Sequence, residues 1–309
     1  AGLSETIPAV TLDLQCGSAL ESITAAAAKI ESGLADLVIA GGFESSSTQP
    51  VRMWNPNHPD YQEGKSYTVA KFIPGFQGEQ VMLEGAEKTA LTENVTKAEM
   101  DPWVLLSHKR AAQAAKESAL SDIQISIADS KKDEGIRPSM SQRLLDRLPY
   151  LLPGGSAITA ANACLMHDGA AFVVLCSEKY RKEHGLTPQA AFRFGTAIGS
   201  DPFMSPKTAV LAIRKLLTQT GLSIDDIDSL EVNEAFAVID VLLEREFPGI
   251  RERLNPLGGA LAYGHPYGAS GAIILSHLLK DLQMNQGRFG ICGVAAAGGI
   301  GTALLVERV

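Results

Sequence analysis

The amino-acid sequence predicts an α/β fold whose core is internally duplicated. Apolar segments of strand length alternate with apolar or alanine-rich segments of helical length, and small residues mark the turns between them. Such alternation is typical of a sheet that helices cover on both faces. The same order of strand, small-residue turn and helix occurs near both ends of the chain, which indicates a duplication. A chain of 309 residues can form two domains or one large layered domain.

The first copy of the pattern lies at the N-terminus. We predict a buried strand over Val10–Gln15, a turn at Cys16–Gly17–Ser18 and a helix that ends near Gly33. The next strand covers Leu37–Ala40 and runs into Gly41–Gly42. Because the chain begins with alanine, immediately before a strand of the core, we expect a fragment that lacks the N-terminal part of the first half.

The second copy lies in the C-terminal part of the chain. A strand over Ser229–Val232 turns at Asn233–Glu234 into a helix around Ala235–Glu246. Two adjacent strands, Arg288–Ala295 and Gly301–Val306, are joined by a turn of glycine and alanine. The first of these two strands resembles the region around Leu37, and this similarity supports the duplication.

A region of different composition separates the two copies. Residues from Thr48 to Gly155 are richer in charged residues, proline and lysine, and include a helical stretch over Glu99–Ala119. We interpret this region, 48–155, as an inserted loop domain that covers a site. The first half of the core then comprises residues 1–47 and 156–180, and the second half comprises residues 181–309.

Composition and charge exclude several classes of function. The chain is 45% hydrophobic and 20% charged, as in an ordinary globular protein, and its net charge of -8 argues against a nucleic-acid surface. No apolar run has the length of a membrane span. The four cysteines lack metal-ligand spacing, so we expect no metal, and we expect no permanently bound cofactor. We also expect no disulfide framework in a chain of this size, and therefore a cytoplasmic location. The segment Gly298–Gly301 joins two strands, so it is not a dinucleotide-binding fingerprint.

Cys16 is the candidate nucleophile. It lies between the first predicted strand and a helix that begins near Gly17. The N-terminus of a helix lowers the pKa of a thiol, and the free backbone N–H groups there can hold an oxyanion. The alternative interpretation is a small buried hydrophobic side chain, the more common role of a lone cysteine.

His265 is the candidate base. Glycine and alanine surround it from Gly258 to Gly271, so the backbone can pack closely around the imidazole. The alternative is a core histidine with satisfied hydrogen bonds. Asn233, at the end of a strand, can orient a water molecule or the imidazole, or it can cap the following helix. Together with Cys16, these residues fit nucleophilic acyl chemistry.

Several motifs, taken together along nearly the whole chain, resemble the thiolase family. The motifs are Cys16–Gly17–Ser18, Ala40–Gly41–Gly42–Phe43–Glu44–Ser45, Ser107–His108–Lys109–Arg110–Ala111–Ala112, Thr159–Ala160–Ala161–Asn162–Ala163, Asp168–Gly169–Ala170, Asn233–Glu234–Ala235–Phe236, Gly264–His265–Pro266 and Gly298–Gly299–Ile300–Gly301. The resemblance implies two βαβαβαββ halves packed as five layers, α/β/α/β/α, with an inserted loop domain. It also implies a strand–helix–strand–helix segment before the first residue of this chain.

The resemblance assigns roles to individual residues. Cys16 takes the acyl group from a coenzyme A thioester, and His265 activates this thiol and donates to the thioester oxygen. Asn233 holds a water molecule that completes that oxyanion hole. The backbone N–H groups of Cys16 and Ala297 form a second hole for the acyl-enzyme. The resemblance further implies that four residues contact the coenzyme A or acyl group: Ala160, Cys164, which replaces the usual serine, Met204 and Phe236.

The chain departs from the family pattern near its C-terminus. Thiolases place a second cysteine at the end of the penultimate strand, where it exchanges a proton with the α-carbon of the second acyl-CoA. An alignment without gaps puts Ala295 at this position. Cys292 lies three residues earlier, so its side chain points to the opposite face of the strand. A methyl group carries no exchangeable proton, and a positioned general base contributes roughly 10²–10⁴-fold to a rate.

Three functional hypotheses follow. The first is an acyltransferase of the acetyl-CoA C-acetyltransferase type that forms acyl-Cys16, with an impaired carbon–carbon bond step. The second is an acyl-CoA hydrolase or weak acyl-transfer enzyme that loses the acyl group of Cys16 to water. The third is a catalytically silent subunit that serves assembly or binds coenzyme A. The resemblance also implies a homodimer or homotetramer.

Overall fold

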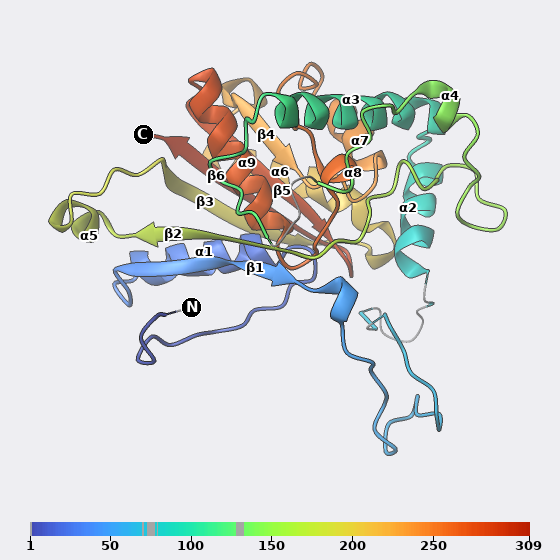
Figure 1. The fold of residues 1–309 in the computed structure, drawn as a ribbon, viewed down its shortest axis with the longest axis horizontal. Coiled ribbons are helices and arrows are strands. Elements are labelled where there is room, and N and C mark those ends of the chain that lie inside the picture. Colours follow the sequence, from blue (N-terminus) through green and yellow to red (C-terminus); the bar gives the residue numbers. More distant parts are fainter. Residues whose placement is uncertain (1, 70, 73–77, 79, 128–132) are drawn as a thin grey trace.

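The computed structural model describes residues 2–69, 71–72, 78, 80–127 and 133–309. Figure 1 shows the arrangement of its elements. The strands are β1 (Leu37–Glu44), β2 (Gly169–Cys176), β3 (Ala190–Gly199), β4 (Ser229–Val232), β5 (Phe289–Ala296) and β6 (Ile300–Arg308). The α-helices are α1 (Ser18–Glu31), α2 (Val81–Thr92), α3 (Lys97–Lys116), α4 (Gln142–Leu145), α5 (Glu178–Glu183), α6 (Thr208–Thr220), α7 (Val238–Glu246), α8 (Ala260–Tyr263) and α9 (Ser270–Asn285). Three short 3-10 helices complete the described elements: η1 (Ser46–Thr48), η2 (Pro202–Lys207) and η3 (Ile224–Asp226).

The strands form two sheets. The larger sheet has the order β3-β6-β5-β4, in which β5 and β4 are parallel and the other pairs are antiparallel. The smaller sheet is the antiparallel pair β1–β2. In both sheets an antiparallel pair follows a helix, since α1 precedes β1 and α9 precedes β5. The duplicated pattern that the sequence predicts is therefore present in the fold.

Helices α1 and α9 lie between the two sheets. One apolar cluster joins Leu20 and Ile23 of α1 and Leu278 of α9 to Val294 of β5, and the strand residue Val38 of β1 packs against it. The buried residues of α1 recur along one stripe of the helix: Ala19, Leu20, Ile23, Ala26 and Ala27. This spacing is that of an amphipathic helix. Helices α6 and α7 contribute to a second cluster on the opposite face of the larger sheet, together with Ile291 and Ala295 of β5.

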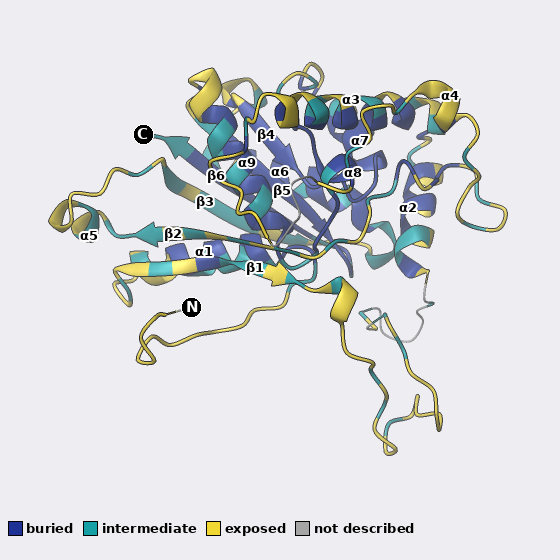
Figure 2. Cartoon of the chain, in the orientation of Figure 1, coloured by how far each residue is buried: buried dark blue, intermediate teal, exposed yellow. Residues whose placement is uncertain are grey.

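The two sheets differ in how far they are buried. Strands β5 and β6 are buried along almost their whole length, as expected when helices cover both faces. Exposed and less exposed residues alternate along β2 instead, and Figure 2 shows β1 with exposed residues. No described residue forms a helix over the outer face of β1–β2, so four of the five predicted layers are seen.

The predicted strand over Val10–Gln15 is wrong. Val10 is 70% exposed and Leu12 is 41% exposed, and this segment of the described chain forms no ladder with a neighbouring strand. The bridge between Leu14 and Cys16 is local. An apolar run becomes a buried strand only where a sheet edge accepts its backbone groups. Here no described strand lies beside it.

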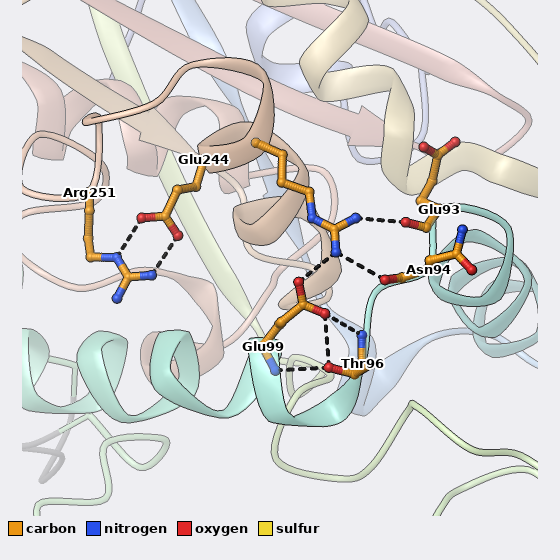
Figure 3. Close-up of polar contacts among 7 residues, drawn as sticks. Glu93, Asn94, Thr96, Glu99, Glu244 and Arg251 are labelled. Carbon is orange, nitrogen blue, oxygen red and sulfur yellow. Dashed lines mark hydrogen bonds and ion pairs between the residues drawn. The ribbon is translucent and has the colours of Figure 1, made fainter.

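The region between β1 and β2 packs against the second half of the chain. Helix α3 begins with a capping box between Thr96 and Glu99. The guanidinium of Arg245 in α7 donates to the backbone oxygens of Glu93 and Asn94, at 2.7 and 3.0 Å, and to the carboxylate of Glu99. Figure 3 shows these contacts beside the ion pair of Arg251 with Glu244. The ends of α2 and α3 are thereby attached to the outer helix layer of the larger sheet.

Candidate active site

Cys16 lies in a tight turn at the start of α1. Gln15 has a positive φ of 54°, a conformation that is uncommon for residues other than glycine. The hydroxyl of Ser18 accepts the N–H of Leu14 at 2.9 Å and donates to the carbonyl of Gln15 at 2.6 Å, which closes the turn. Cys16 is only 7% exposed. The turn therefore holds the thiol in the interior, between the two sheets.

Two backbone N–H groups lie near the thiol of Cys16, those of Ala297, in the turn between β5 and β6, and of Cys16 itself. Both groups lower the pKa of the thiol, but burial outweighs them and raises this pKa to about 12. The predicted lowering of the pKa is therefore not seen in the free protein. The thiol is neutral at rest and needs a base.

His265 supplies a neutral imidazole. It lies between α8 and α9, is 1% exposed, and its backbone N–H donates to Leu165 at 2.8 Å. Burial lowers the pKa of the imidazole to about 3, so the ring is uncharged at neutral pH. Gly264 has a φ of 89°, and a side chain there would overlap the ring of His167. The glycine before His265 is thus required by conformation and by space.

Asn233 contacts His265 directly. It follows β4, its N–H donates to Gly293 of β5 at 3.0 Å, and its Nδ2 lies 3.2 Å from Nε2 of His265. The Oδ1 atom of Asn233 is buried without a hydrogen-bond partner. An unpaired buried oxygen is unfavourable unless water or a ligand supplies a donor. The structure thus favours the contact with the imidazole over a simple helix cap, since α7 begins at Val238.

Cys164 lies between these two segments. Its N–H donates to Ala235 at 3.0 Å, and the neighbouring residues Ala163 and Met166 form bridges with Phe236 and His265. Burial raises the pKa of its thiol, and the nearby Cys16 raises it further. The segment that carries Cys164 therefore runs through the site.

Ala295 and Phe236 line a small apolar pocket. The other lining residues are Met82, Ser205, Pro206, Ala235 and Ile239. Met204 is adjacent to this lining on η2 but is not part of it, and Ala160 is exposed, with no described contact to the cluster around Cys16. Of the residues that the sequence indicates, the structure pairs Asn233 with His265 and Cys16 with Ala297, and it places Phe236 beside Ala295 in this pocket.

Cys292 lies away from this pocket. It is fully buried in the middle of β5, opposite Glu231 of β4 and Leu304 of β6. It belongs to the apolar cluster with α1 and α9, whereas Ala295 belongs to the cluster with α6 and α7. The ladder between β5 and β6 continues through both residues without a bulge. The two side chains therefore lie on opposite faces of the strand.

The remaining motifs connect parts of the site. The hydroxyl of Ser107 in α3 donates to Glu234 at 2.7 Å and accepts the N–H of Gly259 at 3.1 Å. The carboxylate of Glu44, at the end of β1, accepts the N–H of Gly268 at 3.0 Å. These bonds join loops that are distant in the sequence. They explain why polar and charged residues occur in motifs that otherwise consist of glycine and other small residues.

Sequence reasoning missed two residues next to His265. The Oγ atom of Ser270 lies 2.6 Å from Nδ1 of the imidazole, and the ring of Tyr267 packs edge-on against it at 4.8 Å. Both residues belong to the glycine-rich run that contains His265. A polar residue within that run, close to the histidine, was the signal that could have found Ser270.

No group of three or more histidine, cysteine, aspartate or glutamate side chains in the described part of the chain could hold a metal ion.

Comparisons with known proteins identify the family of the chain. The family model of the thiolase N-terminal domain matches residues 1–179, and that of the thiolase C-terminal domain matches residues 186–308. The chain belongs to the thiolase family. It is 34% identical to a steroid 3-ketoacyl-CoA thiolase of Mycobacterium tuberculosis, over 100% of this chain and 77% of that protein. It is also 34% identical to a putative acetyl-CoA C-acetyltransferase of Bacillus subtilis, over 99% of this chain and 81% of that protein.

Solved structures of thiolases have the same fold. The acetyl-CoA acetyltransferase of Bacillus anthracis superposes with a TM-score of 0.91 at 32% identity, covering 100% of this chain and 81% of that one. Human mitochondrial 3-ketoacyl-CoA thiolase in complex with CoA gives a TM-score of 0.91 at 30% identity, covering 100% and 80%. The predicted thiolase fold is confirmed. No helix in the described part of this thiolase is long and apolar enough to span a membrane.

Proposed function

We propose that this thiolase is an acyl-CoA acyltransferase that works through an acyl group on Cys16. The observation that carries the proposal is the contact between the buried side chains of Asn233 and His265, at 3.2 Å, together with a buried Cys16 thiol near the N–H of Ala297. The substrate class, a coenzyme A thioester, is that for which the thiolase relatives are named, and acetyl-CoA and acetoacetyl-CoA are the substrates we favour. We expect a cytoplasmic homodimer or homotetramer.

In the proposed first half-reaction, Cys16 and His265 transfer the acyl group from coenzyme A to the thiol of Cys16. His265 takes the proton of the Cys16 thiol, and the thiolate attacks the carbonyl carbon of the thioester. The negative charge that forms on the oxygen is held by donors in the site, and the protonated imidazole is one of them. Coenzyme A then leaves as a thiol with the proton, and acyl-Cys16 remains. We propose that the N–H groups of Cys16 and Ala297, which lie near the sulfur, hold the acyl oxygen.

The second half-reaction is where this chain differs. At the end of β5 the pocket is lined by the methyl group of Ala295, and Cys292 is buried on the opposite face of the strand. We propose that neither side chain exchanges a proton with the second acyl-CoA. We therefore propose a slow carbon–carbon bond step. The same observation favours a second candidate function, hydrolysis of acyl-Cys16 by water.

An exchange experiment distinguishes the hypotheses. The protein is incubated with acetyl-CoA and isotopically labelled coenzyme A, and label in acetyl-CoA, free coenzyme A and acetate are measured. Acyl transfer predicts label in acetyl-CoA, and Cys16→Ala abolishes it. Acetate without exchange indicates a hydrolase. Neither product, with a protein that melts cooperatively, indicates a silent subunit and contradicts the proposal.

A further inference from the structure

The imidazole of His265 has a different polar neighbour at each nitrogen. The Oγ atom of Ser270, the first residue of α9, lies 2.6 Å from Nδ1, and Nδ2 of Asn233 lies 3.2 Å from Nε2. The three side chains are 1% to 3% exposed. In such a buried site, each proton of these groups goes to an available acceptor, because an unpaired donor is costly.

The hydroxyl of Ser270 determines where the imidazole proton lies. A serine hydroxyl carries one proton. Ser270 donates this proton to the carbonyl oxygen of Pro266 at 3.0 Å, and a carbonyl oxygen can only accept. The Oγ atom is then an acceptor toward Nδ1, so the ring proton of His265 must be on Nδ1. The other nitrogen, Nε2, keeps its lone pair and accepts from the amide of Asn233.

We propose that Ser270 is a positioning residue that holds His265 as the Nδ1–H tautomer, so that Nε2 is the proton acceptor of the site. The role of Nε2 as the base for Cys16 rests on the proposed function, whereas the tautomer does not. Two contacts keep the ring in place. The backbone N–H of Ser270 donates to the carbonyl oxygen of Pro266 at 2.9 Å, which fixes Ser270, and the ring of Tyr267 packs edge-on against the imidazole. Burial keeps the imidazole neutral by lowering its pKa.

The tautomer has a direct chemical consequence. When Nε2 takes the proton of the Cys16 thiol, the imidazole becomes an imidazolium with a proton on each nitrogen. The Nδ1–H continues to donate to Ser270, and the new Nε2–H is free to donate to the oxyanion that forms on the thioester. When coenzyme A leaves, it takes the Nε2 proton and the resting tautomer returns. In the opposite tautomer, Nε2 already carries a proton and cannot accept another.

The first test is spectroscopic and needs no substrate. The protein is labelled with ¹⁵N-histidine, and long-range proton–nitrogen spectra report the tautomer of each of the six histidines. His265→Gln identifies the signal of His265. We expect the wild-type ring in the Nδ1–H form. In Ser270→Ala we expect this preference to be lost, and in Ser270→Thr, which keeps the hydroxyl, we expect it to be restored. A wild-type ring in the Nε2–H form, or an unchanged tautomer in Ser270→Ala, would overturn the proposal.

The second test is kinetic. Removal of the hydrogen-bond partner that orients a metal-bound histidine typically lowers activity by about 10- to 100-fold, and we expect a loss of acetyl exchange of similar size in Ser270→Ala. Ser276→Ala is the matched control, because Ser276 lies on the same helix and its hydroxyl donates to the backbone oxygen of Ala272. A comparable loss in the control would mean that the effect is structural. If the wild type shows no exchange, the proposed function fails, and the tautomer is still decided by the spectra.

Discussion

The two sheets of this thiolase are built on the same pattern but are not equally enclosed. In the larger sheet, β5 and β6 pack against α1 and α9 on one face and against α6 and α7 on the other. In the smaller sheet, β1 and β2 pack against the same central helices but leave their outer face exposed, with Ile39 51% and Val174 65% accessible. One half of the duplicated core is therefore closed in this chain, and the other half is open.

The two halves supply different groups of the candidate site. The open half supplies the turn with Cys16, and the closed half supplies Asn233, His265 and the N–H of Ala297. The groups that orient one another thus come from the fully packed half. The thiol comes from a turn that is held by local hydrogen bonds and by contact with the closed half.

The largest expected effect concerns chemistry at the end of β5, in the closed half. Ala295→Cys places a thiol in the pocket lined by Phe236 and Pro206. We expect the formation of acetoacetyl-CoA from acetyl-CoA to rise by roughly 10²–10⁴-fold, because a thiol at this position can exchange the proton of the α-carbon. The measurement is the rate of acetoacetyl-CoA formation.

Two variants control this prediction. Ala295→Ser adds an atom of similar position without the acidity of a thiol, and we expect little gain. Cys292→Ala should leave the rate unchanged, because Cys292 is buried on the opposite face of β5. A loss of the carbon–carbon step in Cys292→Ala would show that this cysteine, and not the position of Ala295, serves the reaction.

The next effect tests the comparison of the sheets directly. Ile291 of β5 is fully buried. Ile39 lies on β1, the strand of the smaller sheet that corresponds to β5, and it is half exposed. We expect Ile291→Ala to lower the free energy of unfolding by about 2–5 kcal/mol. Ile39→Ala should change it by about 0.5 kcal/mol or less, as at most surface sites. Urea unfolding of both variants measures the difference. Equal losses would show that the outer face of β1–β2 is covered in solution.

A smaller effect lies in the outer helix layer of the closed half. Both carboxylate oxygens of Asp240 in α7 are buried without partners, and burial raises the pKa of this carboxyl well above its ordinary value. The folded chain therefore holds a proton that the unfolded chain releases, so Asp240 lowers stability as the pH rises between the two pKa values. We expect Asp240→Asn to reduce the fall in unfolding free energy as the pH rises from about 5 to about 8. An unchanged pH dependence would contradict this.

Much of the closed half was predictable from the sequence. The strand over Ser229–Val232 agrees with the structure, and the helix that ends at Glu246 begins later than predicted, because residues 233–237 contact the segment of Cys164. The error over Val10–Gln15 has a general cause. Apolar composition reports that a segment can be buried, but a strand needs a neighbouring edge, and this information is not local.

The candidate site was predictable where a motif carries it. Cys16, His265 and Asn233 lie in motifs with small residues around them, because close packing requires glycine or alanine there. The contacts of Ser270 and Tyr267 with the imidazole depend on how the turn before α9 folds back, which spacing does not report. The raised pKa of Cys16 likewise follows from burial that no motif shows.

The most direct test of the account is the detection of acyl-Cys16. The protein is mixed with acetyl-CoA, quenched in acid and digested, and the peptide that contains Cys16 is examined by mass spectrometry. We expect one acetyl group on Cys16, a strongly reduced amount in His265→Ala, and none on Cys164, Cys176 or Cys292. An unmodified Cys16 in wild-type protein, or an acetyl group on another cysteine, would contradict it.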